Sequence, residues 1–203
     1  SGAYTGVDAL AGATPLSALA GNDFGFLLHT YSITDLVVGN IPGAMGEINA
    51  IAILIGLAYL LIRKTADWRV VVSSFGTFVI LIFVLGLVQY PDYLGQFMLY
   101  SIFSGGLLFG IVFMVTDPVT SPVTGPGRFL YGAIVAAIIV LIRSFGAYPE
   151  GVAFAILFAN MLVPLIDYGK WSTNKIKPWF VVGFATFIVA MCAIVFFGAG
   201  GTF

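Results

Sequence analysis

The stretch VVVSSFGTFVILIFVLGLV, residues 70–88, decides the fold because it runs for 19 residues without a charged side chain. A helix needs roughly 20 apolar residues to cross the hydrocarbon core of a bilayer. The whole chain has the same character: of its 203 residues, 60% are hydrophobic and 8% are charged. Soluble domains carry about 25% charged residues. The composition therefore predicts an integral membrane protein.

Five further apolar segments occur, and short turns rich in Pro and Gly separate them, as expected between helices. The apolar runs are continuous rather than alternating, which excludes the pattern of a membrane β-barrel. The predicted fold is an all-α integral membrane protein, a bundle of about six transmembrane helices over residues 47–203. The helices are expected near residues 47–62, 70–88, 94–115, 129–142, 151–166 and 179–198.

The basic residues predict the orientation. If the six helices alternate in direction, seven of the eight Lys and Arg residues fall on one side of the membrane. These seven are Arg63, Lys64, Arg69, Arg128, Lys170, Lys175 and Lys177. Arg143 alone falls on the other side, where its side chain is expected to snorkel toward the interface. Because basic residues favour the cytoplasmic side, residues 1–46 are predicted to form an extracytoplasmic loop.

Several polar or small residues interrupt the apolar pattern. Region 24–46, which contains Asp35, Asn40 and Pro42, is expected to form an interfacial helix followed by a re-entrant turn. Gly106 and Gly110 form a small-xxx-small pair that predicts close helix packing. Asn160 lies within an apolar run, so it is expected to form an interhelical hydrogen bond.

Two classes of function are excluded by composition. The net charge is −1, which gives no basic surface for nucleic acid, so no nucleic-acid partner is predicted. The chain has one Cys and one His, so a metal site built from its own ligands is not expected. No glycine-rich dinucleotide fingerprint and no cluster cysteines are present either.

The segment VDALAGATPLSALAG, Val7–Gly21, is too short and too rich in Ala and Gly to span a membrane. Thr14 has a plain structural interpretation, as the N-cap of a helix with Pro15 at its first position. It lacks a neighbouring His or Lys that would activate its hydroxyl, so no catalytic residue is predicted here.

Four stretches together resemble the family of RnfD and NqrB. They are VDALAGATPL (Val7–Leu16), GNIPGAMGE (Gly39–Glu47), FGIVFMVTDPVTSPVTGPGR (Phe109–Arg128) and the segment Tyr131–Asp167, in the order of that family. The motifs ATPL, TSPVT and GAYPEG look closer to RnfD. The segment 179–198 extends beyond the expected end of the family, and its role is left open.

The resemblance implies a flavoprotein of the prokaryotic cytoplasmic (inner) membrane. In the family's motif a threonine hydroxyl is joined to the phosphate of FMN on the outer side, which corresponds here to Thr14. Asp8, Gly12 and Ala13 match the rest of that motif, whereas Ala9 and Ala11 depart from it. A separate flavin transferase would make the bond.

Two further parts of the chain are candidates for flavin contacts. The turn containing Asn40 and Gly43 is expected to offer backbone amides to the cofactor, or to be a plain helix entry. The loop 116–128 is either fixed by its prolines or a contact for another subunit or a second, non-covalent flavin such as riboflavin.

Three functions remain open from the sequence. The first is a subunit of the Rnf complex, which relays electrons between reduced ferredoxin and NAD and couples this to Na+ or H+ translocation, with other Rnf subunits and lipid as partners. The second is NqrB, a component of a Na+-translocating NADH:quinone reductase. The third, of a different class, is a small-solute channel without flavin.

Overall fold

The computed structural model describes residues 31–41, 43, 46–146, 150–168 and 176–200. Within these ranges the regular elements are all helical, which confirms the all-α class. They are α3 (Ile33–Val38), α4 (Ala50–Ile62), α5 (Trp68–Gln89), η1 (Pro91–Tyr93), α6 (Leu94–Phe103), α7 (Leu107–Phe109), η2 (Gly110–Met114), α8 (Gly125–Phe145), α9 (Val152–Ile166) and α10 (Pro178–Gly200).

Each apolar segment predicted from the sequence is helical, and polar side chains cap the starts of α4 and α5. The side chain of Asn49 accepts a hydrogen bond of 2.9 Å from the amide of Ala52 at the start of α4. Asp67 accepts one of 2.8 Å from the amide of Arg69 at the start of α5. Side-chain acceptors of this kind satisfy amides that have no partner within the helix.

The lengths of the helices differ from the prediction. Three of them, α5, α8 and α10, are long and apolar enough to cross a membrane. The predicted helix 94–115 is instead a bent pair, in which 91–103 and 107–114 meet at 59°, and counts as a fourth span if taken as one. With 13 and 15 residues, α4 and α9 are shorter than the roughly 20 residues a span requires.

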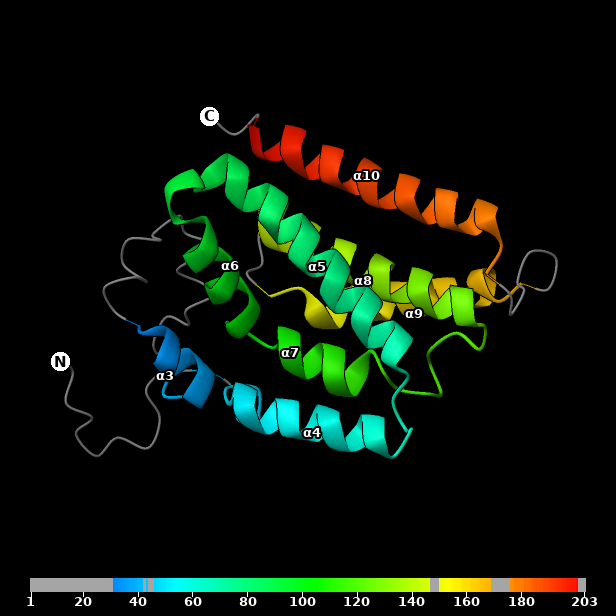
Figure 1. Cartoon of the computed structure of the whole chain (residues 1–203), viewed down its shortest axis with the longest axis horizontal. Coiled ribbons are helices and arrows are strands. Elements are labelled where there is room, and N and C mark those ends of the chain that lie inside the picture. The colour runs from blue at the N-terminus through cyan, green and yellow to red at the C-terminus, as the bar shows by residue number, and fades with distance from the viewer. Residues whose placement is uncertain (1–30, 42, 44–45, 147–149, 169–175, 201–203) are drawn as a thin grey trace.

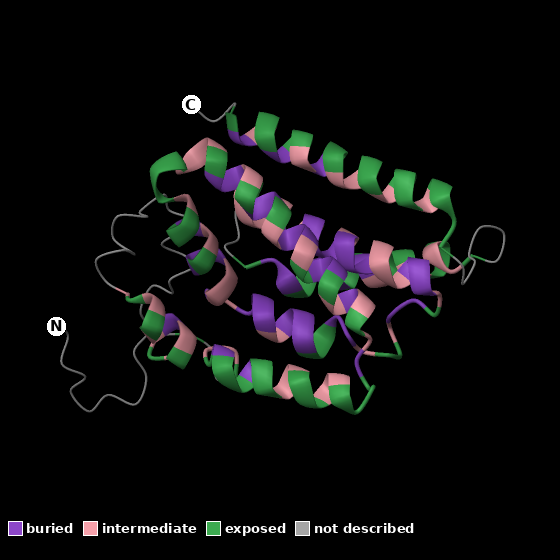
Figure 2. Cartoon of the chain, viewed as in Figure 1, coloured by how far each residue is buried: buried purple, intermediate pink, exposed green. Residues whose placement is uncertain are grey.

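Successive helices run back and forth along one axis, with α5 and α8 at the centre (Figure 1). On one side α10 lies along α5, and on the opposite side α4 lies beside α7. Buried residues gather on α5, α8 and α7, whereas α4, α9 and α10 expose much of their surface (Figure 2). The exposed residues are largely apolar, as expected for helices that face lipid or partner subunits.

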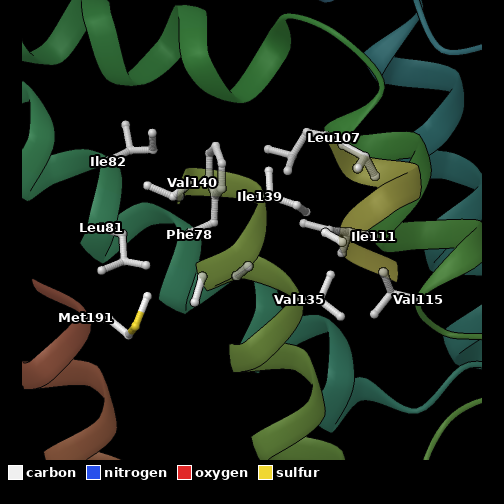
Figure 3. Close-up of a cluster of buried hydrophobic side chains, with 14 of the residues drawn as sticks. Phe78, Leu81, Ile82, Leu107, Ile111, Val115, Val135, Ile139, Val140 and Met191 are labelled. Atoms are coloured by element: carbon white, nitrogen blue, oxygen red, sulfur yellow. The ribbon is translucent and has the colours of Figure 1, made fainter. Parts of the chain in front are cut away.

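The core is one apolar cluster with buried side chains from α3, α5, α6, α7, η2, α8, α9 and α10, part of which is drawn in Figure 3. Phe78 and Leu81 of α5 lie beside Ile139 of α8, and Met191 of α10 approaches from the outer side. The backbones of α5 and α8 come close at Gly132, where a Cβ atom would lie 2.8 Å from the carbonyl oxygen of Val70. The absent side chain therefore sets how closely the two central helices pack.

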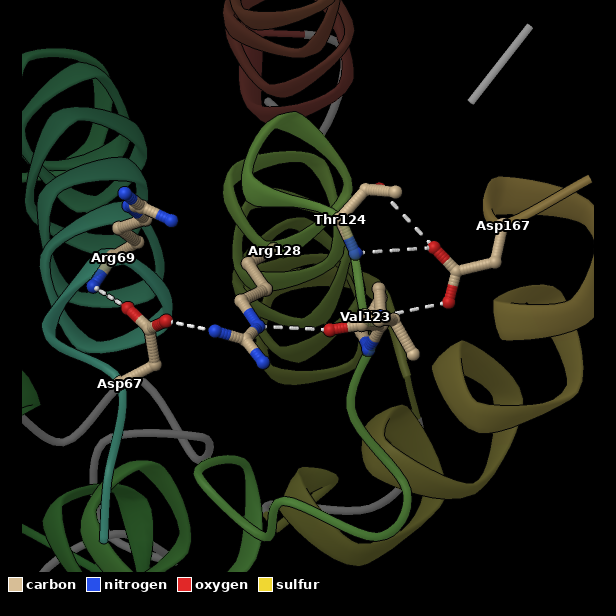
Figure 4. Close-up of polar contacts among 7 residues, drawn as sticks. Asp67, Arg69, Val123, Thr124, Arg128 and Asp167 are labelled. Carbon is tan, nitrogen blue, oxygen red and sulfur yellow. Dashed lines mark hydrogen bonds and ion pairs between the residues drawn. The ribbon is translucent and has the colours of Figure 1, made fainter. Parts of the chain in front are cut away.

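A polar network links the start of α5, the loop that enters α8 and the end of α9 (Figure 4). Arg128 forms an ion pair with Asp67, and its Nε donates a hydrogen bond of 2.9 Å to the carbonyl of Pro122. Asp167, just after α9, accepts hydrogen bonds from the amide of Val123 (2.8 Å) and the hydroxyl of Thr124 (3.1 Å). These contacts hold the loop that leads into α8.

Candidate functional site

The residues predicted to carry FMN fall into two groups. Asp8, Gly12, Ala13 and Thr14 lie outside the described residues, so their arrangement stays a prediction. Asn40 and Gly43 are described, and both are exposed in the turn that connects α3 to α4.

Local hydrogen bonds define the turn after α3. Gly39 has a φ of 90°, a left-handed conformation that suits glycine, and ends the helix there. The amides of Gly39 and Asn40 both donate to the carbonyl of Asp35 at 2.8 Å. The backbone amide of Asn40 is therefore already used, and its exposed side chain is the part that a ligand could reach.

The same turn leads into a convergence of three helix starts. Glu47 lies just before α4, Glu150 just before α9, and Gly106 just before α7. The amide of Gly106 donates a hydrogen bond to the carboxylate of Glu150. A Cβ atom on Gly106 would lie 2.6 Å from Oε2 of Glu47 and 3.0 Å from Oε1 of Glu150. Two carboxylates thus approach the amide end of α7, where negative charge is stabilised by the helix dipole.

The break between α6 and α7 makes this convergence possible. It comprises Ser104, Gly105 and Gly106, and Gly105 adopts a φ of 71° that favours glycine. The prediction that Gly106 and Gly110 pack as one small-residue pair on a continuous helix is wrong for Gly106, which caps the second half. Gly110 does allow a close approach, because a Cβ there would collide with Val152 of α9.

Arg143 binds the C-terminal end of α6, on the other side of the break. Its guanidinium donates hydrogen bonds to the carbonyls of Ser101 (2.8 Å) and Ser104 (3.3 Å), at the C-terminal end of α6. The guanidinium carbon also lies 5.5 Å from the centre of the Phe78 ring, within the range of a cation–π contact. The expectation that Arg143 snorkels outward is wrong, because backbone carbonyls inside the bundle offer it acceptors.

Polar atoms without partners concentrate near this break. Among the described residues, the buried side-chain atoms that lack a hydrogen-bond partner are Ser104 Oγ, Arg143 Nε and Ser144 Oγ. The sequence carried a signal for the break in the Ser-Gly-Gly run at 104–106. It carried none for Glu150 and Arg143 as its partners, because they are 44 and 39–42 residues away in the chain.

Deeper in the bundle, Asn160 behaves as predicted. Its Oδ1 accepts a hydrogen bond of 2.6 Å from the hydroxyl of Tyr131, which joins α9 to α8. The interhelical hydrogen bond is therefore confirmed, and the polar groups of this pair are used in packing.

The charges around the break bear on where FMN could sit. Glu47 and Glu150 already occupy the amide end of α7, so this end does not offer a place for a phosphate. A phosphate esterified to Thr14 would need no such pocket, since the covalent bond itself fixes it. Among the described candidate residues, Asn40 keeps an exposed polar side chain in the turn after α3.

Most of the chain matches one known family of membrane proteins. A model of the family described as "NQR2, RnfD, RnfE family" matches residues 2–177, which leaves α10 outside the match. The chain is 40% identical over 169 residues to a protein of Chromohalobacter salexigens, a subunit, designated B, of the Na(+)-translocating NADH-quinone reductase. This similarity covers 81% of the chain and 41% of the relative.

Two further relatives carry the same name. The protein from Pseudomonas aeruginosa is 39% identical over 176 residues, covering 84% of this chain and 43% of its own length. The protein from Haemophilus influenzae is 38% identical over 174 residues, covering 81% and 42%. The chain therefore spans less than half the length of these curated relatives.

Proposed function

Because the chain belongs to the NQR2, RnfD, RnfE family, we propose that it is a flavin-bearing membrane component of an ion-translocating electron-transport complex. The observation that carries this proposal is the motif VDALAGATPL, Val7–Leu16, which lies within the matched range 2–177. FMN on Thr14 would supply the redox chemistry, and the protein would fix its position. The other subunits of the complex, a flavin transferase during maturation and the lipid bilayer are the proposed partners.

Between the two complexes, we now favour the Na+-translocating NADH:quinone reductase. The relatives described above are named as a subunit of that enzyme, which supports the second function open from the sequence over the first. The Rnf complex remains a second candidate because of the motifs ATPL, TSPVT and GAYPEG. These similarities give no support to a solute channel without flavin.

The role of each site residue follows from its chemistry. The hydroxyl of Thr14 would hold the phosphate of FMN as an ester, and the small side chains of Gly12 and Ala13 would leave room for the transferase. Asp8 matches the acidic position of the motif. The exposed side chain of Asn40, and the open backbone at Gly43, would contact the cofactor from the neighbouring turn. A second, non-covalent flavin at loop 116–128 is less supported, because Asp167 and Arg128 already bind that loop.

We place the Thr14 segment on the extracytoplasmic side of a prokaryotic cytoplasmic membrane. The alternating helices support this, because the end of α4, the start of α8 and the start of α10 share one end of the bundle (Figure 1). Arg63 and Lys64 follow α4, Arg128 lies in the first turn of α8, and Lys177 precedes α10. Excess Lys and Arg mark the cytoplasmic end. The turn between α3 and α4 lies at the opposite end.

The proposed function is tested by purifying the assembled complex from cells that also express the flavin transferase. We expect Na+-stimulated electron transfer from NADH to quinone, and a fluorescent flavin band for this chain in a denaturing gel. Thr14→Ala is expected to remove both the band and the electron transfer, whereas Thr5→Ala, outside the motif, should leave both intact. Transfer between ferredoxin and NAD in place of quinone reduction would favour the Rnf complex, and a dark band would contradict the flavin role.

A further inference from the structure

We infer that Arg143 and Glu150 are positioning residues that hold the bent pair of α6 and α7 broken, one at each free helix end, and that the broken form is the one that couples ion movement to electron transfer. The coupling part of this inference rests on the proposed function. The structural part does not, because it concerns the helix ends alone.

The break leaves backbone groups without partners at both ends. The last carbonyls of α6 have no donor, and the first amides of α7 have no acceptor, within their own helices. Inside a bilayer there is no water to replace them, so broken helices persist only where protein groups satisfy these ends. The span therefore needs partners from elsewhere in the chain.

The two charged side chains supply these partners, and each has the charge opposite to that of the helix end it contacts. Arg143 donates to the carbonyls of Ser101 (2.8 Å) and Ser104 (3.3 Å), at the negative end of the α6 dipole. The carboxylate of Glu150 accepts from the amide of Gly106, at the positive end of the α7 dipole. The guanidinium suits the first task because its planar fork reaches two carbonyls at once.

A continuous helix is the competing state. Residues 94–114 carry no charged side chain and, at about 1.5 Å per residue, would form a straight helix of roughly 30 Å, enough to cross the membrane. That rod would regain the backbone hydrogen bonds lost at the break. It would also carry η2 away from α4 and α9, which it contacts in the broken form. Removing the charged partners should therefore shift the span toward the straight state.

The break also matters for transport because it brings polar groups together where half-helices meet. Glu47 and Glu150 both approach Gly106 at this level of the bundle. Broken helices place ion-binding groups inside the membranes of many transporters. Electron transfer depends on the distance between redox groups, whereas ion movement would depend on the polar groups around Gly106. Straightening the span should thus lower the number of ions moved per electron more than the electron-transfer rate.

The structural part is tested with two spin labels on the chain in lipid nanodiscs, at Gly95→Cys and Met114→Cys, in a Cys192→Ser background. A straight helix separates these positions by about 29 Å, and the broken form should give a shorter distance. We expect the shorter distance in the parent chain, a partial shift toward the straight-helix distance in Glu150→Gln, and the full shift in the double variant Arg143→Met with Glu150→Ala. Arg143→Lys, which keeps the charge, should rescue part of the broken population.

Matched controls are Arg63→Met and Asp92→Asn, which remove the same charges at exposed positions. An unchanged distance in the double variant, or an equal change in the controls, would overturn the structural part. If the double variant does not fold, the graded shift from Glu150→Gln to Glu150→Ala decides instead. No flavin is needed for this readout, so its failure is distinct from a failure of the proposed function.

The coupling part is tested in the assembled complex in liposomes by measuring ions transported per electron. Arg143→Met is expected to lower this ratio at least threefold while the FMN on Thr14, quantified in the same sample, stays at the parent level. An unchanged ratio would overturn the coupling role. A sample without FMN in the parent complex would instead contradict the proposed function.

Discussion

At the scale of the residue, Gly132 lets the two central helices approach closely because it has no Cβ atom. A Cβ atom there would lie 2.8 Å from the carbonyl oxygen of Val70 and 3.0 Å from the amide nitrogen of Ser74. Both are backbone atoms, so neither can turn aside as a flexible side chain would. Gly76, on α5 itself, has nothing within 4 Å of the same added atom.

These two glycines give a matched prediction. Gly132→Ala is expected to lower the free energy of unfolding by about 1–3 kcal/mol, because α5 and α8 must move apart to accept the methyl group. Gly76→Ala should be neutral or stabilising by up to ~1 kcal/mol, since Ala favours the helix. Reversible unfolding in mixed detergent micelles measures both values, and equal destabilisation of the two variants would contradict this account of the packing.

The pair Tyr131 and Asn160 supplies a second prediction at this scale. Tyr131→Phe removes the hydroxyl that donates to Asn160 at 2.6 Å. Interhelical hydrogen bonds in membranes contribute about 0.6 kcal/mol on average and up to about 1.7, so a loss within that range is expected. Tyr59→Phe is the control, because Tyr59 is 63% exposed. A double-mutant cycle with Asn160→Ala isolates the pair, and zero coupling energy would contradict the bond.

Single residues also show what sequence patterns can predict. The role of Asn160 was predictable because an isolated amide in an apolar run needs a partner, and a neighbouring helix is the nearest source. The role of Arg143 was not predictable, because its acceptors are carbonyls exposed by a break in another helix. A basic residue near a helix end has water as its usual partner, and only the tertiary structure reveals a closer one.

At the scale of elements, the bent pair of α6 and α7 shows what the hydropathy pattern does not predict. The run 94–115 reads as one continuous apolar helix, yet α6 ends at Phe103 and α7 begins at Leu107. Hydropathy indicates whether a segment prefers the bilayer to water, but it does not indicate whether the helix bends within the bilayer. The Ser-Gly-Gly run permits the break, but Glu150 and Arg143 stabilise it from the start of α9 and the end of α8, and such distant contacts leave no local pattern.

The loop that enters α8 gives a prediction for an element boundary. Asp167 accepts hydrogen bonds from the amide of Val123 and the hydroxyl of Thr124, so Asp167→Ala leaves these donors without their acceptor. Hydrogen exchange measured by mass spectrometry should become at least tenfold faster in peptides covering residues 119–125. Asp92→Ala, at an exposed position in η1, is the control and should leave that rate unchanged. Unaltered exchange in Asp167→Ala would show that Asp167 does not fix the loop.

At the scale of the whole molecule, composition was sufficient for the class, and the positions of the apolar runs were sufficient for the order of the helices. The alternation of helices, on which the assignment of the charges depends, is the arrangement seen in Figure 1. The short lengths of α4 and α9 were also visible in the sequence, because polar residues bound both apolar runs: Asn49 and Arg63 flank α4, and Glu150 and Asp167 lie close to the ends of α9. The first 30 residues, with most of the candidate flavin site, lie outside the described part of the chain, so that part of the site remains a prediction from sequence.

The proposed orientation predicts opposite labelling of two turns. Asp92→Cys, in η1, should react with a membrane-impermeant thiol reagent added outside intact cells, and Lys177→Cys, just before α10, should react after the membrane is opened. Both variants are made in the Cys192→Ser background. Labelling of both positions from outside would contradict the alternation, and a reversed pattern would place the Thr14 segment in the cytosol.

The most direct test of the central claim is mass spectrometry of the peptide containing Val7–Gly21, from chain matured together with its flavin transferase. The account predicts a mass increase equal to FMN less one water, located on Thr14 and absent from Thr14→Val. An unmodified peptide from fully matured chain, or an adduct that persists in Thr14→Val, would contradict it.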